Sequence, residues 1–136
     1  MFFACRSFAE KFGIMNTILW ICQGLLAVVF LFSGINKTFL SEQQLIAKGQ
    51  TGVVNKPAFV IHAIGICEVL GAVGIIVPWY TGIYPILTPI SAVCFAMIMV
   101  LAAPIHYRLK EPKNIAINTT IFIAAVFVAW GRFSML

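Results

Sequence analysis

The chain has 136 residues, of which 62% are hydrophobic and only 10% are charged, and its mean hydropathy is +1.03. A soluble domain carries roughly 25% charged residues, so the polar surface is too small for a water-soluble globule and the expected solvent is lipid. The net charge of +5 comes from nine basic residues that form no run and stand at the ends of apolar segments, a placement typical of membrane proteins that excludes nucleic acid as a partner.

The first fourteen residues, MFFACRSFAEKFGI, are predicted to be an extension, residues 1–14, of a membrane domain that covers residues 15–136. Met15 is an equally good start for the protein. The first span is expected over Ile14–Ile35, which carries no charge and is long enough, at 1.5 Å per residue, to cross a ~30 Å hydrocarbon core. This run is too long for the apolar region of a signal peptide, so we predict a retained helix.

Helical spacing gathers the long polar and small residues of this span on one face, which should point into the protein: Gln23, Ala27, Phe30, Gly34 and Lys37. The polar connection that follows, residues 36–57, has room for one short helix, Ser41–Ala47, with Ser41 as its N-cap. Two interpretations of this connection remain open. It is either a solvated loop on the membrane surface or a lid over a polar mouth.

The second span is expected over Ala58–Val77, ending at Pro78, and it has one carboxylate, Glu68, near its middle. A charge there costs at least ~2.5–3.5 kcal/mol, so Glu68 should be neutral, paired or facing a polar cavity. We expect Glu68 to be mostly protonated and to contact Gln23 or a bound ligand. Lys37, at the end of its span, is expected to snorkel towards water instead.

The third span is expected over Ile83–Ile105, with a kink at Pro89. The fourth follows a charged turn, HYRLKEPK, and covers Ile115–Trp130. It is the shortest span, and basic side chains such as Arg132 should snorkel at its ends. The later spans also have inward-facing stripes: Gly65, Glu68, Gly71, Ala72 and Ile75; then Thr88, Ala92, Phe95, Met99, Ala102 and His106; then Asn114, Asn118, Ala125, Ala129 and Arg132.

Four spans place both termini on one side of the membrane, together with all three tryptophans, which are typical of a membrane interface. Three basic residues lie on that side: Arg6, Lys11 and Arg132. Six lie on the other: Lys37, Lys48, Lys56, Arg108, Lys110 and Lys113. The positive-inside rule therefore predicts cytoplasmic charged loops and external termini. The expected location is a bacterial plasma membrane.

A polar intramembrane cluster is the candidate site, composed of Gln23, Lys37, Glu68, His106 and Asn118. Glu68 lies ~15 Å below the start of its helix, and the other groups could line a funnel that closes on it. Two interpretations remain open. Glu68 either has only a structural role, in an interhelical hydrogen bond worth ~0.6–2 kcal/mol, or is part of a site for a ligand, a quinone or a proton relay.

The four cysteines, Cys5, Cys22, Cys67 and Cys94, match neither a zinc site nor a CxxC pair. Three of them lie in apolar segments, where cysteine acts as a small hydrophobe, so we expect them to be dispensable. Spacing indicates no metal site, and no nucleophile–base pair is legible.

Several segments occur in an order that resembles the DoxX-like membrane proteins: LWICQGLLAVVFLFSGINK, then IGICEVLGAVGIIVP, then TPISAVCFAMIMVLAAPIHYRLKE, then a late Asn and WGRF. The similarity covers the chain from Met15 onward. It implies a compact four-helix membrane bundle in which Lys37, Glu68, His106 and Asn118 occupy the recurrent polar positions of the family. Some relatives are linked to thiosulfate:quinone oxidoreduction and others to redox stress, whereas most have no assigned activity.

The sequence thus predicts an all-α integral membrane four-helix bundle with no legible catalytic motif. Its expected role is that of an accessory or quinone-associated subunit of a membrane redox system, with the lipid bilayer and a membrane subunit as partners and a quinone as the candidate cofactor. If it is an enzyme, it is a subunit of a quinone-linked oxidoreductase. The alternatives are a transporter of a small solute or protons and an assembly factor for a partner protein.

Overall fold

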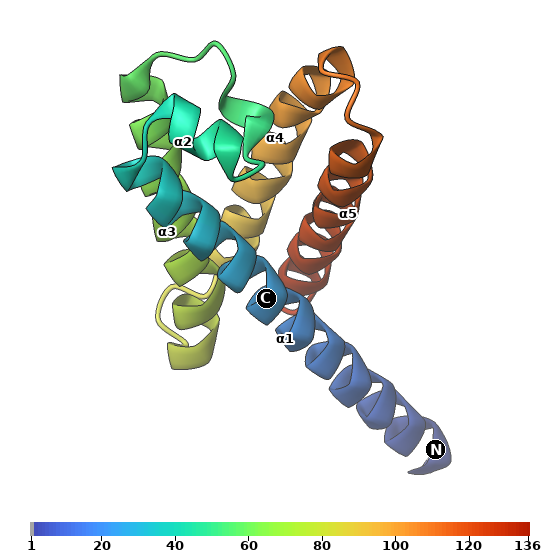
Figure 1. Ribbon diagram of the computed structural model, residues 1–136. Coiled ribbons are helices and arrows are strands. Elements are labelled where there is room, and N and C mark those ends of the chain that lie inside the picture. Colours follow the sequence, from blue (N-terminus) through green and yellow to red (C-terminus); the bar gives the residue numbers. More distant parts are fainter. Residues whose placement is uncertain (1) are drawn as a thin grey trace.

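The computed structural model describes residues 2–136, without the side chains at positions 2, 5 and 8, and within that range the chain is helical and has no strand. Figure 1 shows how its elements are arranged. In chain order they are α1 (Phe2–Phe39), α2 (Glu42–Ala47), the single 3₁₀ turn η1 (Thr51–Val53), α3 (Ala58–Thr81), α4 (Leu87–Arg108) and α5 (Pro112–Ser134). Among these, α1, α3, α4 and α5 are each long and apolar enough to cross a membrane, which confirms the predicted fold class.

Helix α1 is longer than predicted, because it begins at Phe2 and runs without a break through Met15 to Phe39. No proline interrupts residues 2–13, and Arg6 and Glu10 form an ion pair of 3.3 Å one turn apart. The helix is about 57 Å long, well over the ~30 Å of a hydrocarbon core. Its N-terminal part extends beyond the other helices in Figure 1.

The prolines affect the helices less than expected. Helix α3 continues past Pro78 to Thr81 and ends at Gly82, whose positive φ of 71° suits glycine. Pro78 lacks the N–H that would bond the carbonyl of Gly74 four residues earlier. The Thr88 hydroxyl, from the start of α4, donates to that carbonyl at 3.2 Å. Pro89 lies in the first turn of α4, where no intrahelical donor is needed.

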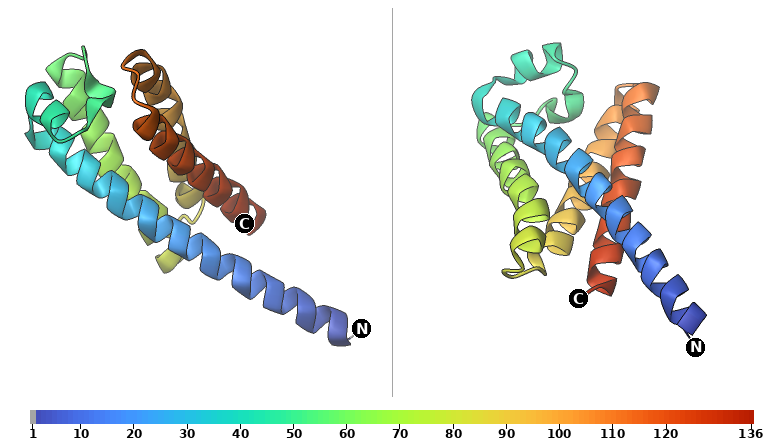
Figure 2. Two further views of the ribbon diagram at one scale, coloured as in Figure 1. Left: turned by 45° about the vertical axis from the view of Figure 1, so that its right-hand side comes forward. Right: turned by 90° about the horizontal axis from the view of Figure 1, so that it is seen from below.

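The long helices form two tight pairs, α1 with α3 and α4 with α5. Glycines set the first pair, since a Cβ on Gly34 would lie 2.7 Å from the Gly65 carbonyl oxygen and a Cβ on Gly65 would lie 2.8 Å from that of Gly34. The two pairs meet at one end of the bundle and splay apart at the other, as the views in Figures 1 and 2 show. We call the splayed end, which holds residues 40–57 and the α4–α5 turn, the loop end, and the opposite end, near residues 82–86, the link end.

The main apolar core fills the space between the pairs from the middle of the bundle to the link end. Its centre is a stack of the Phe30 and Phe95 rings, with centroids 3.7 Å apart. The predicted inward stripes are confirmed, because their members are buried or half-buried. A second, small cluster of Leu45, Val53 and Ile61 attaches the polar connection to α3. Within that connection, Ser41 caps α2 as predicted, through a bond from the Gln44 N–H.

Candidate functional site

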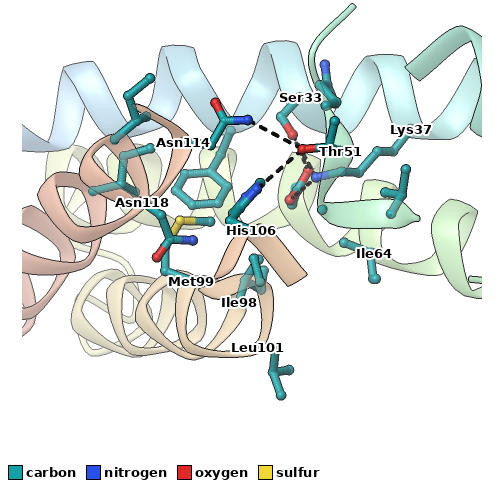
Figure 3. Close-up of a pocket in the computed structure, with 18 of the residues that line it drawn as sticks. Ser33, Lys37, Thr51, Ile64, Ile98, Met99, Leu101, His106, Asn114 and Asn118 are labelled. Atoms are coloured by element: carbon teal, nitrogen blue, oxygen red, sulfur yellow. Dashed lines mark hydrogen bonds and ion pairs between the residues drawn. The ribbon is translucent and has the colours of Figure 1, made fainter. Parts of the chain in front are cut away.

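A cavity of about 260 Å³ lies at the loop end, between the two helix pairs. Every long helix contributes to its wall, and so does the segment 49–53 of the polar connection. Figure 3 shows the polar side chains that converge on it. The polar side chains in the wall come from Ser33 and Lys37 of α1, Glu68 of α3, His106 of α4, Asn114 and Asn118 of α5, and Gln50, Thr51 and Lys56 of the connection.

The innermost polar group is an ion pair between α1 and α3. Lys37 Nζ donates to Glu68 Oε1 at 2.7 Å and to Ser33 Oγ at 2.8 Å. Ser33 Oγ in turn donates to Glu68 Oε2 at 2.9 Å. Both carboxylate oxygens are therefore bonded, and the Glu68 side chain is fully buried while that of Lys37 is 12% exposed. Distances of this kind are typical of charge-assisted hydrogen bonds.

This geometry corrects two expectations about Glu68. Lys37 does not snorkel away, because the Gly34–Gly65 contact brings α1 and α3 so close that a Cβ on Gly65 would lie 2.8 Å from Lys37 Cβ. The lysine therefore starts one turn from the carboxylate and points at it. The expected contact between Glu68 and Gln23 is also wrong, since the partners of Glu68 are Lys37 and Ser33.

A second polar group joins the connection to the α4–α5 turn, and we call it the latch: Thr51, His106, Glu111 and Asn114. Three of its bonds converge on one oxygen, Glu111 Oε2, and Thr51 Oγ1 also contacts His106 Nδ1 at 3.3 Å and accepts from Asn114 Nδ2 at 3.4 Å. Thr51 Oγ1 donates to it at 2.7 Å and Asn114 Nδ2 at 3.0 Å, and His106 Nδ1 lies 3.0 Å away. Hydrogen bonds from Thr51, then Asn114, then His106 lower the pKa of Glu111 to about 2.

The latch decides between the two interpretations of the polar connection. Thr51 and Val53 are buried, and the segment 49–53 lies in the cavity wall. Thr51 ties this segment to the far helix pair through Glu111. The structure thus shows a lid, which we define as residues 49–53, rather than a freely solvated loop.

Asn118, like Gln50, is a polar side chain of the cavity wall without a hydrogen bond, and Gln50 Oε1 is fully buried. Asn118 is only 7% exposed and lies in the cavity wall, where Figure 3 shows it beside Met99. Among residues 2–136, no hydrogen bond to its carboxamide is present. Its donors and its acceptor therefore stay free for a group inside the cavity.

The cavity wall thus contains Lys37, Glu68, His106 and Asn118 of the predicted cluster, but not Gln23. Gln23 lies nearer the link end, where Nε2 donates to the Ile75 carbonyl at 2.6 Å and Oε1 accepts from Arg132 Nε at 2.6 Å. Gln23 lies ten residues, about 15 Å of helix, before Ser33, the nearest residue of α1 that contacts Glu68. It is therefore not level with Glu68, and the expected contact could not form.

Arg132 does not snorkel as expected, because it is fully buried. Its Nη1 donates to Asn16 Oδ1 at 2.6 Å, and its guanidinium lies 5.3 Å from the centre of the Trp20 ring and 4.4 Å from that of Trp79. Helix α5 continues to Ser134, so Arg132 is still inside the helix where α1 crosses it. The prediction that the tryptophans gather on the side of the termini could have indicated this site, because Trp20 and Trp79 both contact Arg132.

Sequence reasoning missed Ser33, Thr51 and Glu111 as members of the loop-end site. Ser33 is one turn before Lys37, and that spacing could have indicated it. Cys67 and Cys94 are exposed on the outside of the bundle and Cys22 is half-buried, and all three are free thiols. The side chain of Cys5 lies outside the described residues, as does Met1.

The fold and its polar sites define an integral membrane protein of the four-helix-bundle class. The model of the DoxX-like family matches residues 21–128, and the chain belongs to that family. The matched segment includes both the cavity and the latch, whereas Asn16 and Arg132 lie outside it. No curated protein and no solved structure matches the chain.

Proposed function

We propose that this protein binds the head group of a quinone-class molecule in the loop-end cavity and acts as an accessory subunit of a membrane redox system. The observation that supports this most directly is the free carboxamide of Asn118, which is buried in the cavity wall without a partner. Small-molecule sites are mostly apolar and have a few convergent polar groups. The cavity has this composition, because Ile98, Met99, Ile121 and other apolar side chains make up much of its wall.

The size and the donors of the cavity suit such a head group. Its volume of about 260 Å³ is just below the ~300–1,000 Å³ usual for drug-sized ligands, so it has room for a single substituted ring. A quinone ring needs donors for its two carbonyl oxygens and apolar contacts for its faces. The Asn118 amide and the Lys37 ammonium are donors in the wall, and Phe30 and Met99 are apolar neighbours.

Within this proposal, each residue has a simple role. Asn118 holds a ring oxygen, and the Lys37–Glu68 pair provides a donor and a proton acceptor at the inner end. A quinone supplies two-electron, two-proton redox chemistry when bound. The chain has no CxxC pair, so we assign the source of electrons to a partner subunit.

The alternatives have less support. If Glu68 had only a structural role, its bonds to Lys37 and Ser33 would suffice to join α1 to α3. The unbonded Asn118 would then have no explanation. A transporter needs a path across the bundle, but the Phe30–Phe95 stack and the buried Arg132 fill the region between the cavity and the link end. No contact among residues 2–136 favours an assembly factor.

Binding of ubiquinone with a single isoprene unit to the purified protein in mild detergent tests the proposal. Asn118→Leu should weaken binding by about tenfold, since one hydrogen bond to a buried group is worth roughly 0.5–1.5 kcal/mol. It should leave thermal stability unchanged or raised, because the Asn118 carboxamide forms no hydrogen bond that the change would remove. Thr119→Leu is the matched control, as Thr119 is exposed on the same helix. Equal binding by both variants would refute the role of Asn118.

We also propose that the loop end faces the cytoplasm of a bacterial cell and that the termini lie outside. The six-to-three distribution of basic residues supports this orientation, and the latch joins the two charged loops at one end of the bundle. Labelling of Lys110→Cys in a cysteine-free background, from outside only, would overturn the orientation.

A further inference from the structure

The loop-end cavity is covered on the side of the lid. Thr51 and Val53 are buried, Val53 packs with Leu45 and Ile61, and the Thr51 hydroxyl donates to Glu111 at 2.7 Å. Gly52 lies against α4, since a Cβ placed on it would lie 3.7 Å from both Ala102 Cβ and His106 Nε2. A ligand that came from the aqueous phase would have to displace the lid and break the latch.

The cavity also reaches the seam between α1 and α5. Two of its lining residues, Val29 of α1 and Ile117 of α5, are 43% and 48% exposed on the outer surface of the bundle. At the link end this seam is closed, because a Cβ on Gly131 would lie 2.6 Å from a methyl carbon of Leu19. Towards the loop end, α1 and α5 diverge, as Figures 1 and 2 show.

This seam lies at the depth of the lipid tails. Val29 is about 15 Å of helix before the end of α1 at Phe39, and Ile117 is about 7 Å after the start of α5 at Pro112. The two residues therefore face the hydrocarbon layer rather than the polar surface of a membrane.

We propose that the cavity is loaded from the bilayer through the seam between α1 and α5, by a molecule with a polar ring and a long apolar tail that remains in the seam. This inference rests on the proposed function and narrows its ligand to long-chain isoprenoid quinones. The head group contacts Asn118 and Lys37. The tail passes between Val29 and Ile117 into the lipid, and the lid stays closed.

The experiment compares ubiquinones with one and with ten isoprene units, added to the full-length protein in lipid nanodiscs. Bound quinone is extracted after removal of the excess and is then quantified. Ile117→Trp fills the seam, whereas Ile123→Trp, on the same helix and exposed without lining the cavity, is the matched control. Leu101→Trp tests entry between α3 and α4 instead, because Leu101 lines the cavity from α4 and is 70% exposed.

We expect Ile117→Trp to reduce retention of the ten-unit ubiquinone by about tenfold and to leave the one-unit form within about threefold of the parent protein. Ile123→Trp and Leu101→Trp should both behave like the parent. Equal behaviour of Ile117→Trp and Ile123→Trp would overturn the seam while quinone binding stands. A loss confined to Leu101→Trp would overturn it as well, because entry would then lie between α3 and α4. Binding of neither quinone by the parent would refute the proposed function itself.

Discussion

The loop end and the link end each bury a cation, but they stabilise it in different ways. Lys37 at the loop end has a carboxylate partner, Glu68, beside a cavity. Arg132 at the link end forms no ion pair with an acidic residue within positions 2–136. It is held by the amide oxygens of Gln23 and Asn16 and by the faces of two indole rings.

The difference indicates that one end of the bundle has a structural role and the other a role in binding. An arginine stays charged under all ordinary conditions, and neutral partners around it cannot exchange a proton at neutral pH. The link end is therefore suited to hold the helices together. An ion pair next to an unbonded amide in a cavity can rearrange when a ligand arrives, so the loop end is suited to binding.

The largest effect should come from Gln23→Leu at the link end. This change leaves the Arg132 Nε–H without its acceptor in a fully buried position, and a hydrogen bond to a charged group is worth about 1.5–3 kcal/mol, with the penalty of an orphaned charge in addition. We expect a loss of about 3 kcal/mol in unfolding free energy, measured by circular dichroism during titration with a denaturing detergent. Ligand binding at the loop end should not change.

The matched control is the double variant Gln23→Leu with Arg132→Met, which removes the charge together with its acceptor. It should be more stable than Gln23→Leu alone, because no orphaned cation remains. A double variant that is less stable than either single one would show that the link end does not depend on this bond.

The sequence was enough to predict the spans and their inward faces, but not the side-chain partners. Span length follows from the thickness of the bilayer, and the faces follow from the period of the helix, so both are local properties. The partner of Glu68 depends on how closely α1 approaches α3, which is set by Gly34 and Gly65 together. Such a contact joins residues far apart in sequence, and one sequence does not reveal which glycines meet.

The same reason explains the other errors. Pro78 was expected to end its helix, but Thr88 from the next helix donates to the carbonyl that the proline leaves free. Glu111 looked like an ordinary charge in a polar turn, because nothing in its neighbourhood indicates that Thr51 will reach it. Gln23, Glu68 and Asn118 stood out because they are polar within apolar spans. Of the residues that were missed, Thr51 and Glu111 lie in polar segments, where the same residue types are common, whereas Ser33 lies inside the first span.

A smaller loss of stability is expected from Glu68→Leu at the loop end. It removes the partner of the Lys37 ammonium, but this side chain is partly exposed and lies next to a cavity, so it can move towards water. We expect a loss of about 2 kcal/mol, below the range for a fully buried broken pair. The double variant with Lys37→Met should recover most of it.

Infrared spectroscopy reports the state of the pair directly. We expect the parent protein to show a carboxylate band at neutral pH that is lost in Glu68→Gln, in line with the short bond to Lys37. A band of protonated acid that disappears in Glu68→Gln would restore the expectation of a neutral Glu68.

The smallest effect concerns the response of the latch to low pH. The pKa of Glu111 is lowered from 4.5 to about 2 in the folded protein, so its contribution to stability is complete above pH 4.5 and is lost as the pH falls towards 2. In a cysteine-free background, a spin label on Gln50→Cys in the lid should therefore become more mobile between these values. Glu111→Gln should show a mobile label already at pH 7. A label equally immobile in both proteins at pH 7 would show that the lid is held without Glu111.

The position of Arg132 in the chain also has a consequence for biogenesis. Its acceptor on Gln23 lies 109 residues earlier, so the first helix enters the membrane long before the residue that completes its polar contacts has been made. The α1–α3 pair has its own glycine contact and ion pair, and it can form while the ribosome is still translating α4 and α5. Closure of the bundle is therefore a late event, and Gln23 depends on other partners, such as the Ile75 carbonyl, until α5 is inserted.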